Sequence, residues 1–341
     1  MLRLLLALSC AAALNAAPGT VYVPLRDVFQ AGQQFFVGDL EVGTPGQPMS
    51  VIVAIDGLTC LNSVRCSDPY CTSHRQYDAS ASSTYQEDGT PFDLPGGLNI
   101  SGVLSKDSVS LGGATVSDVL FAEATSVWNQ WSTDAPNDGV LGLGFSPAAP
   151  SILDALAEQG VIADRLAGIW LGRDGVGGEL TLGGINEQRY TSPLTWTPIV
   201  DNMVSAESVT VGQVSVCAAD CRVGATSVSP YFFLTMQMAK TINDALGGTD
   251  IGQPGVAALD CATLDALPTL ELVIAGRSLQ MSPRQYTVVI PLTGGESLCL
   301  SGFVGQPEAP PADITVGTLF MQQFYAAYDM DNMQLGFTDS A

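Results

Sequence analysis

The sequence predicts a mostly β protein built from two similar lobes, and three observations support this fold class. From residue 33 onward, short apolar or alternating runs are separated by Gly, Pro, Asn and Asp, which is typical of strands joined by turns. Helical periodicity is limited to two short stretches, 151–160 and 238–248, each of which ends in glycine. An apolar strand and a cysteine recur in the two halves, which favours an internal duplication.

The 341 residues, of which 46% are hydrophobic, are enough to bury two cores. We expect a first β lobe over residues 17–192 and a second over 193–341. The expected strands, in chain order, are 35–43, 49–55, 102–113, 138–145, 168–173 and 178–184 in the first lobe, then 211–217 and 221–228 in the second.

Residues 1–16 have the layout of a secretory signal peptide. Arg3 precedes an apolar run that is followed by small residues. A membrane anchor is the alternative, but it needs roughly 20 apolar residues, and the run is broken at Asn15 and Pro18. We therefore expect a secreted, extracellular protein.

The charge balance is strongly acidic. Lys and Arg number 12 against 34 Asp and Glu, which gives a formal net charge of -22. Such a surface repels nucleic acid and anionic membranes, so we expect neither as a partner. The charge fits a protein of an acidic space, and it equally fits one that simply stays soluble.

The chain has eight cysteines, of which Cys10 belongs to the expected signal peptide. The seven others predict disulfides with one thiol left over, because an exported protein meets an oxidising compartment. Zinc binding is the alternative for the closely spaced pairs, but only one histidine, His74, accompanies them. We expect no metal and no cofactor.

Five separated segments, in order, resemble the pepsin-like (A1) family of aspartic proteases, whose fold is bilobal with a central cleft. The resemblance covers nearly all of the expected mature chain. The segments are Val42–Pro48 with the strand after it, Cys66–Cys71 with Tyr77–Tyr85, Asn137–Gly144, Gly178–Gly184 with Trp196–Pro198, and Cys217–Cys221 with the run from Asp260 to Tyr286.

The resemblance implies three disulfides and one free thiol. Its pairs are Cys66–Cys71, Cys217–Cys221 and Cys261–Cys299, which leaves Cys60 unpaired at an apolar position of the family pattern.

The family cleaves peptides with two aspartates, each from an Asp-Thr-Gly loop, that share one proton. This chain contains no Asp-Thr-Gly. Aligned without a gap from Gly43, the first aspartate falls on Ala54; counted from Cys221, the second falls on Thr226. Neither side chain is an acid or base at a working pH, so we expect no catalytic residues.

Asp56 is the fallback candidate for an acid in the first loop. It lies two residues beyond Ala54, so the preceding strand would need a bulge or a shift for Asp56 to serve. The other interpretation is a solvated turn carboxylate, because Asp followed by Gly57 is a common turn pair.

The segment that would cover a bound peptide is altered as well. In the family a tyrosine on a hairpin flap occupies the position that is Pro95 here, and Leu61 replaces the tryptophan that partners it. Asn99 begins an Asn-Ile-Ser sequon, so an exported protein would carry a glycan near the mouth of the cleft. Such tripeptides also occur by chance and stay unmodified.

These residues favour a secreted pepsin-like homologue that is catalytically inactive, a monomer whose cleft binds a peptide, a protein or a small ligand. Two alternatives remain: an active aspartic endopeptidase that uses displaced acids such as Asp56, and a structural or storage protein. Catalysis by Cys60 is disfavoured, because His74 is the sole imidazole and sits beside a disulfide loop.

Overall fold

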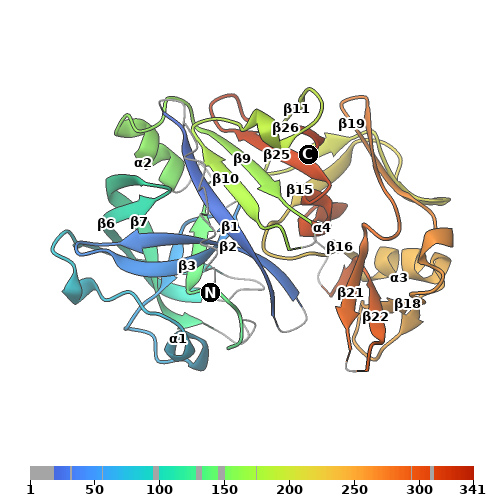
Figure 1. Ribbon diagram of the computed structural model, residues 1–341, viewed down its shortest axis with the longest axis horizontal. Coiled ribbons are helices and arrows are strands. Elements are labelled where there is room, and N and C mark those ends of the chain that lie inside the picture. Colours follow the sequence, from blue (N-terminus) through green and yellow to red (C-terminus); the bar gives the residue numbers. More distant parts are fainter. Residues whose placement is uncertain are drawn as a thin grey trace, which may run out of the picture.

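The computed structural model describes residues 19–30, 33–55, 57–94, 100–127, 133–144, 150–173, 175–292, 294–307 and 311–341. Asp56, Pro95, Asn99 and the expected signal peptide lie outside these ranges. Strands dominate the described residues, as the sequence predicts (Figure 1). No helix among them is both long and apolar enough to cross a membrane.

The elements up to residue 192 are mostly long strands. Their helices are α1 (Pro69–Ser73) and α2 (Ile152–Glu158), with single turns η1 (Ala79–Ala81) and η2 (Glu187–Arg189). Their strands are β1 (Val21–Gln30), β2 (Gln33–Val42), β3 (Gln47–Ala54), β4 (Cys60–Asn62), β5 (Gln86–Leu94), β6 (Ile100–Leu111), β7 (Ala114–Val127), β8 (Gly139–Gly142), β9 (Leu166–Leu171) and β10 (Gly178–Leu182).

The elements after residue 192 are shorter. Their helices are α3 (Met236–Ala245) and α4 (Thr318–Met321), with the single turn η3 (Leu264–Ala266). Their strands are β11 (Thr195–Pro198), β12 (Val204–Ala206), β13 (Ser208–Val211), β14 (Val214–Cys217), β15 (Cys221–Ala225), β16 (Phe232–Thr235), β17 (Thr249–Asp250), β18 (Ala257–Leu259), β19 (Leu270–Ile274), β20 (Arg277–Met281), β21 (Thr287–Pro291), β22 (Ser297–Ser301), β23 (Phe303–Gln306), β24 (Ile314–Val316), β25 (Phe324–Asp329) and β26 (Gln334–Asp339).

One large sheet joins the two halves of the chain. Its thirteen strands run in the order β11-β26-β25-β9-β10-β1-β2-β3-β8-β4-β7-β6-β5, so the last strands of the chain, β25 and β26, extend the sheet of the first lobe. β25 pairs antiparallel with β9 through partners such as Ala327 and Gly168. Three smaller sheets complete the second lobe. In Figure 1 the blue-to-green strands of this sheet lie on one side of the molecule and the orange elements β21 and β22, which belong to a smaller sheet, lie on the other.

The strands form where the sequence alternates. In β6, for example, buried and partly exposed side chains alternate along most of its length, because successive side chains point to opposite faces of a strand. The two expected helices are present as α2 and α3, and both begin at a capping residue. Ser151 and Asp154 cap α2 reciprocally, and the Thr235 hydroxyl accepts the backbone N–H of Met238 in α3.

The structure confirms the disulfides that the family resemblance implies. Cys66 pairs with Cys71, Cys217 with Cys221, and Cys261 with Cys299. Cys60 is free and buried. Three disulfides fit a protein of an oxidising compartment, either extracellular or lysosomal.

Candidate functional site

Ala54 and Thr226, the two positions that we expect to correspond to the family's catalytic aspartates, lie at equivalent strand ends. β3 ends at Ala54 and runs parallel to β8, where Ala54 pairs with Gly142. β15 ends at Ala225, one residue before Thr226, and runs parallel to β24, where Ala225 pairs with Val316. Each lobe therefore presents its candidate residue at the carboxyl end of one strand of a parallel pair.

Glycines let each of these strand ends pack tightly against a neighbouring loop. A Cβ on Gly142 would collide with the carbonyl oxygen of Gly57, and one on Gly317, just after β24, would collide with that of Ser229. Backbone amides also bind the loops directly. Leu143 N donates to Ala54 O over 2.9 Å, and Thr226 N donates to Val316 O over 2.8 Å. Backbone groups and glycines therefore hold both loops, without help from the side chains at 54 and 226.

A hydrogen bond joins the two loops. The Ser227 hydroxyl donates to the Val53 carbonyl oxygen over 2.6 Å, and both residues are buried. Ser227 follows Thr226 and Val53 precedes Ala54 in the chain. The bond therefore joins the residues adjacent to the two candidate positions across the junction of the lobes.

A second contact across the junction, from Ile55 of the first loop to the second lobe, is apolar. Ile55, the residue after Ala54, is 6% exposed and belongs to the main hydrophobic core. It lines a cavity together with Val223 and Ala225 of β15 and Val316 of β24. An isoleucine cannot donate or accept a hydrogen bond. Among the described residues of the two loops, Ser227 thus makes a polar contact across the junction and Ile55 a hydrophobic one.

The side chains of Ala54 and Thr226 have little chemical reactivity. Ala54 ends in a methyl group. The Thr226 hydroxyl accepts a long hydrogen bond of 3.4 Å from Val228 N, which is a local turn contact. The fallback Asp56, the flap position Pro95 and the sequon Asn99 lie outside the described residues.

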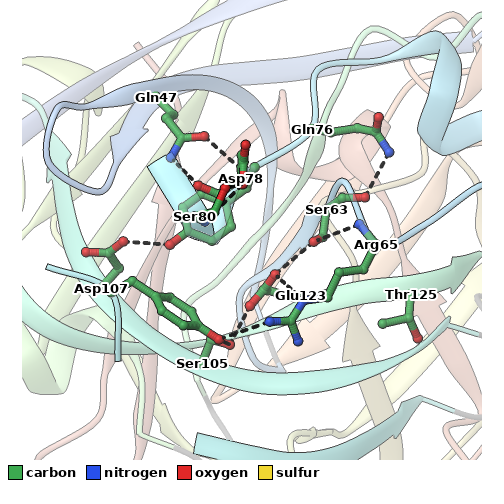
Figure 2. A network of polar contacts seen from close by, with 12 residues as sticks. Gln47, Ser63, Arg65, Gln76, Asp78, Ser80, Ser105, Asp107, Glu123 and Thr125 are labelled. Carbon is green, nitrogen blue, oxygen red and sulfur yellow. Dashed lines mark hydrogen bonds and ion pairs between the residues drawn. The ribbon is translucent and has the colours of Figure 1, made fainter. Parts of the chain in front are cut away.

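Two fully buried carboxylates exist elsewhere in the first lobe, and Figure 2 shows both. Glu123 accepts the hydroxyls of Ser105 over 2.6 Å and Ser63 over 2.8 Å, and Arg65 lies 3.6 Å away. These neighbours already satisfy the Glu123 carboxylate.

Hydrogen bonds hold the Asp107 carboxylate in place in the same way. It accepts the hydroxyls of Tyr77 and Thr84, each over 2.6 Å, and the backbone N–H of Ser108 over 2.8 Å. Burial and the bond to Asp107 raise the pKa of Tyr77. We infer that Glu123 and Asp107 have a structural role and stabilise the sheet.

The other candidates for a base and a nucleophile, His74 and Cys60, are respectively close to backbone carbonyls and buried. His74 faces two backbone carbonyls, with Nδ1 at 2.7 Å from Tyr70 O and Nε2 at 2.6 Å from Ala135 O. Burial raises the pKa of the Cys60 thiol to about 12. Among the described residues, no group of three or more His, Cys, Asp or Glu side chains is placed to hold a metal ion.

Comparisons with known proteins assign the fold to a family. The family model of eukaryotic aspartyl proteases matches residues 35–340. The chain belongs to this family. It is similar to cathepsin D of Dictyostelium discoideum, with 32% identity over 95% of this chain and 87% of that protein. Cathepsin E of Mus musculus is 30% identical over 88% of this chain and 79% of its own length, and cathepsin E-B of Xenopus laevis is 30% identical over 94% and 82%.

Family membership was expected from the motifs, but two features of the site were not. The bond from Ser227 to Val53 joins residues 174 positions apart, and strand patterns do not specify which loops meet. The buried Glu123 did carry a signal, since it is an acid inside a mostly apolar strand run, whereas Asp107 lies among the polar residues Lys106 and Ser108. That signal indicates a buried network, not its partners.

Proposed function

We propose that this member of the eukaryotic aspartyl protease family is catalytically inactive, and that the cleft expected between its lobes binds a peptide without cutting it. The observation that carries the proposal is the pairing of the two loops. The bond from Ser227 to Val53 joins the neighbours of Thr226 and Ala54, and this supports the proposal because neither of these two residues carries a carboxylate.

The chemistry of these two side chains supports inactivity. The family mechanism needs one carboxylate as a base for water and a second as an acid for the peptide carbonyl, about 3 Å apart. Ala54 supplies no ionisable group, and a threonine hydroxyl stays protonated at any working pH. No shared proton is held by this pair.

The preserved scaffold supports binding. The disulfides are those that the family resemblance implies, and the parallel strand pairs β3–β8 and β15–β24 support the loop of each lobe. Secretion belongs to the same proposal and rests on the layout of residues 1–16. A glycan on Asn99 is the third component; it would narrow access to the cleft from the flap side.

A peptide-retention experiment tests this function. The purified protein is mixed at acidic and neutral pH with a tryptic digest of a denatured protein, and the bound fraction is separated by size exclusion and analysed by mass spectrometry. We expect a subset of peptides to be retained with masses identical to the input. Heat-unfolded protein is the control for nonspecific retention.

Two results would overturn the proposal in different ways. Retention no greater than with the unfolded control would remove the binding function. New peptides with cut termini would remove the inactivity, and their loss in an Asp56→Ala variant would identify the displaced acid.

A further inference from the structure

A cavity of about 70 Å³ lies beneath the junction of the loops. Ile55 forms the wall on the side of the first loop, and the second lobe forms the rest. Most lining side chains are aliphatic or aromatic hydrocarbon, and the polar ones are Asn202 and the hydroxyl-bearing Tyr325 and Tyr328; the apolar ones include Val223, Ala225, Val316, Phe320, Phe324 and Ala326.

The cavity reaches the surface at Asn202. This residue lines the cavity and is also exposed, in the turn between β11 and β12. Asp201 and Asn202 both have positive φ, of 51° and 61°, which fixes the turn in the left-handed region. The opening is therefore a short polar turn, and the interior is mainly hydrocarbon.

Such a cavity favours an apolar occupant over water. A buried water needs two to four polar partners, and these walls are mainly hydrocarbon, whereas apolar cavities stay dry and bind xenon or benzene. A cavity of about 150 Å³ accepts benzene. One of about 70 Å³ is better matched to xenon or a short unbranched chain.

We propose that this cavity is a binding site for a short aliphatic molecule with a neutral polar head, such as a linear alcohol. The chain lies against Ile55, Val316 and Ala326, and the head meets the Asn202 amide. An anionic head is disfavoured because Asp201 adjoins the opening and the whole chain carries a charge of -22. This site is independent of peptide binding between the lobes.

Two probes test the apolar interior and the polar opening of the cavity separately. Crystals pressurised with xenon report the interior, and saturation-transfer NMR with butan-1-ol reports the whole site. We expect a xenon peak within the cavity of the native protein, with no ordered water there. We also expect butan-1-ol to bind at least severalfold better than the branched isomer tert-butanol.

Three variants make the test specific. Ala326→Leu should remove the xenon peak and the butan-1-ol signal, because the added carbons fill the cavity. Asn202→Gly keeps the left-handed turn, so xenon should stay while butan-1-ol weakens about three- to tenfold. Val209→Ile, in the core of β13 and away from the cavity, is the matched control for added bulk and should change neither probe.

Xenon absent from the native cavity, or ordered water in it, would overturn the site. If xenon binds in the cavity but the protein binds both alcohols with equal affinity, the proposed ligand class is wrong. Folding of each variant is checked by far-ultraviolet circular dichroism. If Ala326→Leu does not fold, Val316→Ile, which adds a single methylene, replaces it with the same expected loss.

Discussion

Ser227 and Ile55 connect the two lobes at one junction by different physical means. Ser227 donates a short hydrogen bond to Val53, and Ile55 buries an aliphatic side chain in the second lobe. Neither contact depends on the side chains of Ala54 or Thr226. The loops can therefore keep their positions after both carboxylates are lost.

The first prediction concerns the hydrogen bond between the lobes. Ser227→Ala leaves the buried Val53 carbonyl without its donor, which should lower the free energy of unfolding by about 1–3 kcal/mol. Urea denaturation measures the change. Ser215→Ala, at an exposed serine of β14, is the control and should stay within about 0.5 kcal/mol of the native protein. Equal effects of the two changes would mean that the Ser227 contact does not stabilise the junction.

The second prediction concerns restored catalysis. Ala54→Asp alone should be inactive, because its carboxylate would face a threonine. With Thr226→Asp added, cleavage of a fluorogenic peptide at acidic pH should be feeble at best, since Ile55 and Val228 stay, and a misplacement of about 1 Å costs on the order of a hundredfold in rate.

Measurable cleavage should first require both loops to be rebuilt together with Pro95→Tyr. Full family-like activity in the double variant would show that the surrounding residues are unimportant.

The third prediction concerns Cys60. Because burial raises its pKa to about 12, a thiol reagent at slightly alkaline pH should label none of the folded protein and one site per chain after unfolding, as read by intact mass. The folded pKa lies above the unfolded value of about 8.5. The Cys60 contribution to stability should thus be full below that value and decline as the pH rises toward 12. Labelling of the folded chain would contradict this assignment.

At the scale of elements, α2 is fixed to the end of the chain by charge. Arg165 contacts Asp154 of α2 over 2.9 Å and Asp331, in the turn before β26, over 2.7 Å. Burial acts to raise the pKa of Asp154, but the Ser151 backbone N–H and Arg165 outweigh it, and the pKa falls below its usual value. The Arg165 backbone N–H and guanidinium lower the pKa of Asp331.

The fourth prediction follows from these lowered pKa values. A carboxyl group with a depressed folded pKa stabilises the protein above its unfolded pKa of about 3.9, and this contribution is lost as the pH falls through the folded value. Asp154→Asn should therefore cost about 1 kcal/mol at neutral pH and progressively less under strong acid. Urea denaturation at both conditions measures it. Asp164→Asn, at an exposed aspartate nearby, is the control, and a cost that grows in acid would contradict the assignment.

The elements were largely predictable, whereas their pairing was not. The alternation at 102–113 and the apolar run at 49–55 correspond to β6 and β3, because each pattern reports the burial of a local face. The pairing of β25 with β9 depends on residues about 160 positions apart, which no local pattern encodes. The expected lobe boundary at residue 192 stays a prediction.

At the scale of the whole molecule, one sheet carries strands from both halves of the chain (Figure 1). The first loop follows β3 of this sheet, and the second follows β15 of a separate five-stranded sheet. A fold alone does not establish an activity, which depends on the side chains at the site. The proposed function therefore depends above all on the absence of catalytic carboxylates at residues 54 and 226.

The most direct test is a prolonged incubation of the purified protein with an unfolded protein substrate, from strongly acidic to neutral pH, with new peptide termini counted by mass spectrometry. Parallel samples contain a transition-state-mimicking inhibitor of the family or the Asp56→Ala variant. We predict no termini beyond those in a heat-inactivated sample at any pH. New termini that disappear with the inhibitor and with Asp56→Ala would contradict the account and identify an active aspartic protease with a displaced acid.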